Sequence, residues 1–129
     1  MSFLRMQQTV DGHQLMYLLH IPSRVPPPET GWPLLLFLHG LGECSREKQE
    51  LDVPRLRFNG PLEHVRSSRA LQSMAIVTPQ TWCGDNWFRS DVLMAIMEEV
   101  RASGPVRFDP DRRYVNGVSS GGAATWAIA

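Results

Sequence analysis

Hydrophobic residues occur along the chain in short blocks that predict several strands. Phe3 to Val10 and Gln14 to Ile21 flank Asp11-Gly12, a dipeptide typical of the tight turn of a β-hairpin. Two later blocks, Leu34 to Leu38 and Met74 to Val77, are apolar at every position instead of alternating. Continuous apolarity is typical of strands that helices cover on both faces of a sheet.

A well-marked helix is predicted over Asp91 to Ser103. Ser90 can cap its first turn, Asp91 complements the helix dipole there, and Gly104-Pro105 ends it. Five apolar residues at helical spacing form a stripe that we expect to face the core: Val92, Leu93, Ile96, Met97 and Val100.

The segments between these blocks are predicted from their proline, glycine and polar residues. Ser23 to Pro33 is rich in proline and predicts an exposed connection, and Glu43 to about Pro54 predicts a polar loop. A helix is expected over about Leu62 to Leu71, because Pro61 suits a first helical turn. The sequence PQTWCGDNWF after the second apolar block predicts a loop rich in aromatic residues.

The last part of the chain completes the pattern of an α/β fold. Asp109-Pro110-Asp111 predicts a turn into Tyr114 to Val118, a third covered strand, and small residues from Ser120 onward predict a helix. Strands that alternate with helices indicate an α/β domain with an antiparallel start and then a mostly parallel sheet flanked by helices. We expect residues 1–129 to form one incomplete domain.

Composition and charge exclude several classes of protein. Of 129 residues, 43% are hydrophobic and 20% are charged, which is typical of globular domains and excludes a disordered chain. Lys plus Arg and Asp plus Glu number 13 each, so no net field would attract nucleic acid or an anionic membrane. The longest strongly apolar run, Leu34 to Leu38, is far shorter than the roughly 20 residues of a membrane span.

The cysteines and the N-terminus indicate a compartment. MSFLRMQQTV lacks the features of a secretory signal, so we expect a cytoplasmic protein. Cys44 and Cys83 form no CxxC pair and are expected to be free thiols, because cytosolic proteins keep their thiols reduced. No residue spacing indicates a metal, nucleotide or flavin, so we expect no cofactor.

One motif carries the strongest chemical signal. Gly117-Val118-Ser119-Ser120-Gly121 matches G-x-S-x-G between a predicted strand and a predicted helix, the context in which this motif exposes a nucleophilic serine on a sharp turn. Glycines are expected at 117 and 121 because a Cβ would clash there, and Gly122 is expected to keep the approach open. The Ser120 N–H would then face an oxyanion formed by attack of Ser119.

A second backbone donor is expected at the end of the first covered strand, in His39-Gly40-Leu41-Gly42. The glycines on either side of Leu41 would let its N–H face the same point as the Ser120 N–H. Two such donors make an oxyanion hole, and we expect His39 to orient this loop.

These residues resemble a known family. LLLFLHGLGE, VTPQ and DPDRRYVNGVSSGGAATWAIA are similar to the N-terminal half of α/β-hydrolases, nearest to esterases and predicted peptidases of the dienelactone hydrolase, feruloyl esterase and polyhydroxybutyrate depolymerase type. The resemblance implies that Ser119 is the nucleophile and that the Ser120 and Leu41 amides form the oxyanion hole. The sequence departs from the family at Ser120, often methionine, and at Glu43-Cys44-Ser45, expected at the pocket rim.

The acid and histidine of a catalytic triad are expected to be missing. α/β-Hydrolases carry them after the nucleophile in the chain, and no acid or histidine follows Ser120 here. We interpret the upstream histidines as structural or solvated, and Asp85 and Asp91 as loop and helix residues; these histidines are His13, His20, His39 and His64. The chain is therefore expected to be a truncated hydrolase, inactive alone, with an apolar sheet edge at Tyr114 to Val118 that invites self-association or a partner.

Three functions remain open. The complete protein would be a serine esterase that cleaves a small or medium acyl ester through an acyl-enzyme on Ser119, or a peptidase of the same fold. The chain itself would be a non-catalytic fragment or interaction module. Trp82, Trp87 and Phe88 could line a substrate pocket or anchor their loop. The expected partner of the complete enzyme is a small-molecule ester, with no nucleic acid or membrane.

Overall fold

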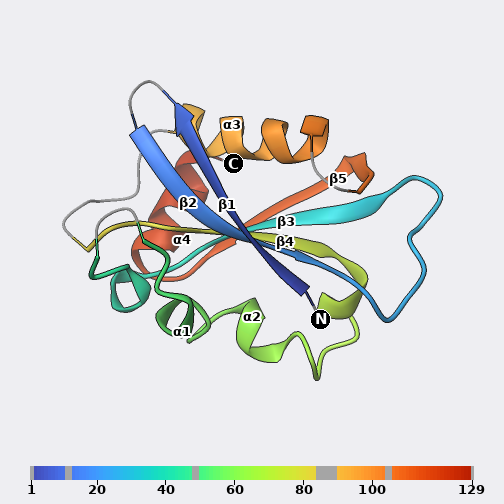
Figure 1. The fold of residues 1–129 in the computed structure, drawn as a ribbon, viewed down its shortest axis with the longest axis horizontal. Coiled ribbons are helices and arrows are strands. Elements are labelled where there is room, and N and C mark those ends of the chain that lie inside the picture. Colours follow the sequence, from blue (N-terminus) through green and yellow to red (C-terminus); the bar gives the residue numbers. More distant parts are fainter. Residues whose placement is uncertain (1, 11–12, 48–49, 84–89, 104–105, 129) are drawn as a thin grey trace.

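A computed structural model describes residues 2–10, 13–47, 50–83, 90–103 and 106–128. A five-stranded sheet lies at the centre, with the strands in the order β1-β2-β4-β3-β5 (Figure 1). The strands are β1 (Ser2–Val10), β2 (His13–Ile21), β3 (Trp32–Leu38), β4 (Ala75–Gln80) and β5 (Phe108–Gly117).

The direction of the strands changes across the sheet. β1 and β2 pair antiparallel, and β2 also pairs antiparallel with β4. β3 then pairs parallel with both β4 and β5. The expected α/β class, with an antiparallel start followed by parallel strands, is confirmed. The Asp11-Gly12 turn of the predicted hairpin lies outside the described residues.

Helices cover both faces of this sheet (Figure 1). α3 (Ser90–Ser103) and α4 (Ser120–Ile128) lie on one face, and α1 (Val53–Leu56) and α2 (Pro61–His64) lie on the other. Two short 3₁₀ helices, η1 (Leu41–Glu43) and η2 (Leu71–Ser73), complete the described elements. None of the helices in the described part of the chain is both long and apolar enough to cross a membrane.

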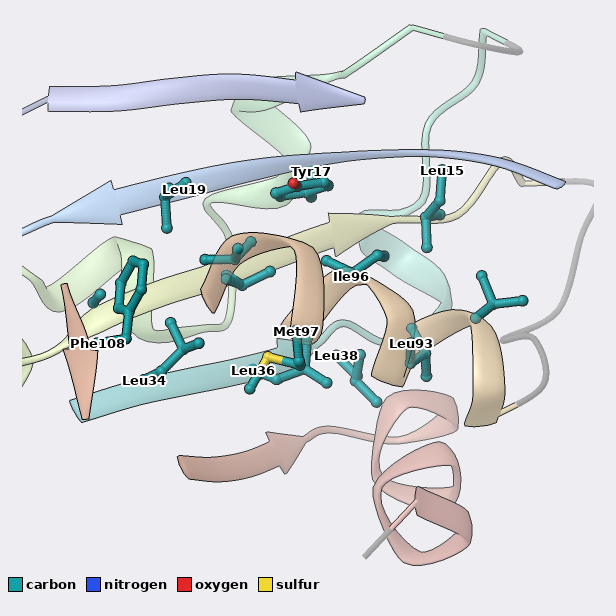
Figure 2. Close-up of a cluster of buried hydrophobic side chains, with 14 of the residues drawn as sticks. Leu15, Tyr17, Leu19, Leu34, Leu36, Leu38, Leu93, Ile96, Met97 and Phe108 are labelled. Atoms are coloured by element: carbon teal, nitrogen blue, oxygen red, sulfur yellow. The ribbon is translucent and has the colours of Figure 1, made fainter. Parts of the chain in front are cut away.

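The larger hydrophobic core lies between the sheet and α3. Leu15, Tyr17 and Leu19 of β2 meet alternate leucines of β3 and the apolar stripe of α3 there, as Figure 2 shows. All five residues of that predicted stripe are buried, because the period of 3.6 residues puts them on one side of the helix. A smaller core under α1 and α2 contains Leu18, Leu35, Phe37 and Ile76 from the opposite face of the sheet.

The helix predicted over Leu62 to Leu71 is wrong. The structure has the one-turn helix α2 and, after a break, η2. Two serines lie at the break: the Ser67 hydroxyl donates to the His64 carbonyl, and the Leu71 N–H donates to the Ser68 hydroxyl at 3.3 Å. The Ser68 hydroxyl takes the place of the backbone carbonyl that a continuous helix would offer to Leu71.

β5 differs from the prediction in both its length and its environment. The predicted turn Asp109-Pro110-Asp111 lies inside the strand, where the register to β3 shifts between the pairs Trp32–Phe108 and Leu34–Arg113. The Asp109 carboxylate accepts from the Asp111 N–H at 2.9 Å and from Arg112 at 2.7 Å, so the turn chemistry forms a bulge instead. β5 pairs only with β3 among the described strands, in agreement with the sheet edge expected there, but its residues 110–117 are exposed or half-buried, so the expectation of a strand covered on both faces is wrong.

Candidate functional site

Ser119 occupies a sharp turn between β5 and α4. β5 ends at Gly117, α4 begins at Ser120, and the exposed Ser119 has a φ of 56°. A positive φ is strained for a residue with a Cβ, and such strain persists only where the surrounding structure enforces it. Here the Val118 N–H donates to Leu38 at 3.2 Å and the Gly121 N–H donates to Val118 at 2.9 Å, which fixes the turn on both sides.

Two glycines allow this turn to pack tightly. A Cβ at Gly117 would collide with the carbonyl of Gly121, and a Cβ at Gly121 would collide with the carbonyl of Leu38. Gly122 differs, because a Cβ there would lie 3.5 Å from the Gly117 oxygen, an ordinary contact. The steric requirement therefore applies to the first two glycines and not to Gly122.

The loop after β3 lies directly against Ser119. A Cβ on Gly40 would come within 3.2 Å of the Ser119 Cβ and 3.3 Å of the Val118 oxygen. The φ of Gly40 is −85°, and Gly42 has open space around it, so the expected need for glycine flexibility on both sides of Leu41 is wrong. A side chain at position 40 would make tight contacts, because the backbone of this loop approaches Ser119 closely. Leu41 begins η1 and is 66% exposed.

His39 anchors this loop to the end of β4. Its side chain is buried, its Nε2 accepts from the Thr81 N–H at 3.0 Å, and its Nδ1 lies 2.5 Å from the Gly40 carbonyl oxygen. Burial lowers the pKa of His39, a shift that hydrogen bonding to Gly40 and the charge of Glu43 partly offset. These contacts join the loop after β3 to the end of β4, and the expected role of His39 in orienting that loop stays a prediction.

Glu43 lies under the loop and not at a pocket rim. Glu43, Cys44 and Ser45 are all buried, so the expected rim position of this segment is wrong. Glu43 Oε1 accepts from the Asn59 side chain at 3.2 Å, and its backbone carbonyl accepts from Gln80 Nε2 at 2.8 Å.

Gln80 and Asn59 were not found from the sequence. Gln80 also accepts from the Asp52 N–H at 2.7 Å through Oε1, so one buried amide joins three segments. Polar residues at the end of a buried parallel strand, as in Thr78-Pro79-Gln80-Thr81, are the signal that could have indicated this network.

The cysteines form a disulfide, so the expectation of free thiols is wrong. Cys44 follows η1 and Cys83 follows β4, and the Cα atoms of these residues are 5.0 Å apart. The Ser45 N–H donates to Thr81 and the Cys83 N–H donates to Ser45, both at 2.8 Å, which holds the two loops side by side. The two cysteines are far apart in the sequence, but they lie in the loops that follow the neighbouring parallel strands β3 and β4. Disulfides are typical of oxidising compartments, so the expected cytoplasmic location loses the support that reduced thiols gave it.

The other aromatic and histidine residues considered from the sequence lie in different parts of the fold. Trp82 is half-buried and pairs with Ser45, while Trp87, Phe88 and Asp85 lie outside the described residues. His20 is buried, where desolvation lowers its pKa, and His64 is exposed on α2. In the described ranges no three histidine, cysteine, aspartate or glutamate side chains gather as ligands for a metal ion.

The fold and the strained serine turn define an α/β protein with its candidate site at the carboxyl ends of parallel strands. No protein-family model matches the chain, and no curated protein does. The chain is similar to a solved structure titled "Crystal Structure of a Thermostable Esterase", with 27% sequence identity and a TM-score of 0.70. This similarity supports a hydrolase of the esterase type.

The match is unequal in length. It covers 97% of this chain and 36% of the chain of the esterase. The 129 residues therefore span about a third of that protein, and they include the strand, turn and helix around Ser119.

Proposed function

We propose that this chain carries the nucleophile and the oxyanion hole of a serine esterase. The observation that carries the proposal is Ser119 itself, exposed and strained between β5 and α4, with Gly40 packed against it. Strain at an exposed serine costs stability, on the order of 1 kcal/mol or more, and proteins retain such strain where a side chain must be presented. The similarity to an esterase agrees with that role.

In this proposal the oxyanion hole consists of the N–H groups of Leu41 and Ser120. Each residue is the first of its helix, so its N–H has no acceptor within that helix. The contact of Gly40 with Ser119 brings the residue before Leu41 against the nucleophile. Donors fixed in advance around a developing negative charge lower the barrier to acyl transfer.

The reaction divides into two steps. Ser119 Oγ attacks the ester carbonyl carbon, the bond to the alcohol oxygen breaks, and the alcohol leaves with a proton while the acyl group stays on Ser119. Water then attacks the acyl-enzyme, releases the carboxylic acid and restores the hydroxyl of Ser119. A base must take the proton from Ser119 in the first step.

We place this base and its orienting acid outside the 129 residues. His39 supports that assignment, because its Nε2 accepts from the Thr81 backbone and its Nδ1 lies against Gly40. The chain is then part of a longer hydrolase and inactive alone. The proposed substrate is an ester of a small or medium acyl group. Of the three aromatic residues considered for the substrate pocket, Trp82 lies within the described residues, and we place it beside the acyl group.

The test uses a fluorophosphonate probe and ester hydrolysis. We expect no appreciable labelling of Ser119 in the chain alone, since no base activates it. We expect hydrolysis of short acyl esters when the chain is joined to the segment of the thermostable esterase that follows the matched region. Ser119→Ala must abolish that hydrolysis, and Ser23→Ala, a serine in an exposed loop, must leave it unchanged.

Two results would contradict the proposal in different ways. Hydrolysis that persists in Ser119→Ala would exclude Ser119 as the nucleophile. Faster cleavage of peptide amides than of esters would make the protein a peptidase of the same fold.

A further inference from the structure

The disulfide between Cys44 and Cys83 is unequally open to solvent at its two ends. Cys44 is buried, with 6% of its surface exposed, whereas Cys83 is exposed. A thiolate breaks a disulfide by attack on one of the two sulfur atoms, and the rate depends on access to that atom. A thiol in solution therefore reaches the sulfur of Cys83 far more readily than that of Cys44.

The guanidinium of Arg55 lies beside the buried sulfur. Its Nη2 is 3.9 Å from Cys44 Sγ, and its Nε donates to the Cys44 carbonyl oxygen at 2.8 Å. Attack on Cys83 leaves the negative charge on Cys44 Sγ, where the positive charge of Arg55 stabilises it. Access and the stability of the leaving thiolate therefore favour the same direction of attack.

An acid near Arg55 does not cancel this positive charge. Asp52 Oδ2 lies 4.0 Å from Arg55 Nε and 3.6 Å from Arg46 Nη2, so one carboxylate is shared by two guanidinium groups. The side chain of Arg55 is 28% exposed and that of Arg46 is 71% exposed, so solvent screens the charge of Arg55 less. The three side chains together keep a net positive charge, and Arg55 is the group that contacts the sulfur of Cys44.

We propose that this disulfide is a thiol-exchange site, at which a small thiol forms a mixed disulfide with Cys83 and releases Cys44 as the thiolate. The thiolate of the small thiol attacks Cys83 Sγ, the bond between the two cysteines breaks, and its electron pair leaves on Cys44 Sγ. A second molecule of the small thiol can then attack the mixed disulfide and release Cys83. Two thiols supply the two electrons that reduce the protein disulfide, and they leave as the oxidised dimer.

The backbone around the disulfide makes the exchange reversible. The Ser45 N–H donates to the Thr81 carbonyl and the Cys83 N–H donates to the Ser45 carbonyl, both at 2.8 Å. Neither hydrogen bond uses a sulfur atom, so both can persist when the S–S bond breaks. They hold the two cysteines side by side, and the Cys44 thiolate can then attack the mixed disulfide and close the bond again.

Exchange changes the restraint on the loop that carries Leu41. Cys44 directly follows η1, and the S–S bond links this loop covalently to the loop after β4. Its loss leaves η1 held by hydrogen bonds, such as that from Gln80 Nε2 to the Glu43 carbonyl at 2.8 Å. Under the proposed function Leu41 is an oxyanion donor, so exchange would loosen the oxyanion hole. That consequence rests on the proposed function, whereas the exchange itself does not.

The direction of attack is tested on the chain as it is, with an excess of reduced glutathione as the small thiol. The reaction is stopped in acid at early times, free thiols are alkylated, and mass spectrometry identifies what each cysteine carries. We expect glutathione on Cys83 and the alkyl group on Cys44, with the opposite arrangement at least about tenfold rarer. Conjugation mainly at Cys44, equal conjugation at both cysteines, or no mixed disulfide would overturn the proposal.

A second measurement separates attack on the folded chain from attack on an unfolded one. Urea at about 1 M, below the unfolding transition, should leave the rate of exchange nearly unchanged, because Cys83 is exposed in the folded chain. If exchange required global unfolding, the same urea would raise the rate about fivefold or more. An increase of that size would also overturn the proposal.

Arg55→Gln tests the stabilisation of the leaving thiolate. Loss of the guanidinium should slow conjugation at Cys83 about threefold or more, because the departing Cys44 thiolate loses its positive neighbour. Arg66→Gln, which removes the same charge from an exposed residue after α2, is the matched control and should leave the rate unchanged. Equal rates in Arg55→Gln and wild type would contradict the role of Arg55.

The arrangement of labels in wild type tests the site even if Arg55→Gln does not fold. None of these measurements uses ester hydrolysis, so a failure of exchange leaves the proposed function standing, and a failure of hydrolysis leaves the exchange site standing.

Discussion

The imidazole of His39 joins the ends of two parallel strands, because its Nε2 accepts a hydrogen bond from the Thr81 N–H at 3.0 Å. His39 follows β3 and Thr81 follows β4. The Nε2 atom can accept only while it is unprotonated, and burial lowers the pKa of this ring so that it remains so. The position of the loop that carries Leu41 therefore depends on the charge of one buried histidine.

This dependence predicts a loss of stability in mild acid. The pKa of His39 is lower in the folded chain than its ordinary 6.5, so the unfolded chain takes up the proton first as the pH falls. The stabilisation is complete above about pH 6.5 and decreases below it, by up to ~1.4 kcal/mol per pH unit. Urea unfolding of wild type from pH 7.5 to 5 measures this slope.

Two variants test whether His39 causes the dependence of the free energy of unfolding on pH. His39→Gln should reduce it without removing it, because burial also lowers the pKa of His20. His64→Gln, which changes an exposed histidine, should leave the slope unchanged. An unaltered slope in His39→Gln would show that His39 is not held neutral by burial.

The disulfide predicts a specific pattern of substitution effects. Cys44 and Cys83 close a loop with a sequence separation of 39. Loss of the cross-link should lower the free energy of unfolding by about 4 kcal/mol in the chain-entropy model. Cys44→Ser, Cys83→Ser and the double variant should lose nearly the same amount in urea unfolding, because each breaks one bond. Separate losses that add in the double variant, or alkylation of both thiols before reduction, would contradict the disulfide.

The glycines of the serine turn predict unequal costs of a single methyl group. Gly121→Ala should destabilise the chain by about 3 kcal/mol or more, because the new Cβ meets the backbone carbonyl of Leu38 and neither chain segment can move freely. Gly42→Ala is the matched control and should change stability by no more than about 0.5 kcal/mol, because its Cβ would enter open space. Thermal unfolding of both variants compares them, and similar losses would show that the turn is looser than described.

The strain at Ser119 predicts a stabilising substitution. Ser119→Gly should raise the free energy of unfolding by about 1 kcal/mol, since glycine adopts a φ of 56° without a steric penalty. Ser119→Ala keeps the Cβ and should give no such gain. If both variants have the stability of wild type, the turn stores no strain at this residue.

The elements that the sequence predicted well are those with one clear pattern of apolar residues. α3 was predicted because its apolar residues recur at helical spacing, and β3 because Leu34 to Leu38 is apolar at every position, as suits a strand that is buried throughout. The helix over Leu62 to Leu71 failed because Ser67 and Ser68 bind backbone groups, a competition that hydrophobic periodicity does not register.

The candidate site divides in the same way. Ser119, Gly117 and Gly121 were predicted from the G-x-S-x-G motif; a Cβ at Gly117 would clash inside the turn itself, whereas a Cβ at Gly121 would clash with the Leu38 carbonyl of β3. Gln80, Asn59 and the pairing of Cys44 with Cys83 depend on which strands become neighbours, and that information is spread over the whole sheet. Trp82 lies in the described chain, and its role toward a substrate stays a prediction.

The contact between Gly40 and Ser119 has a consequence for how this region can evolve. The two residues are 79 positions apart, yet a side chain added at position 40 would make tight contacts with Ser119 and with the Val118 oxygen in the serine turn. Substitutions at these positions are therefore not independent, and a change tolerated in one loop must be matched in the other. The loop that contains Gly40 and the turn that contains Ser119 are therefore expected to change together among relatives.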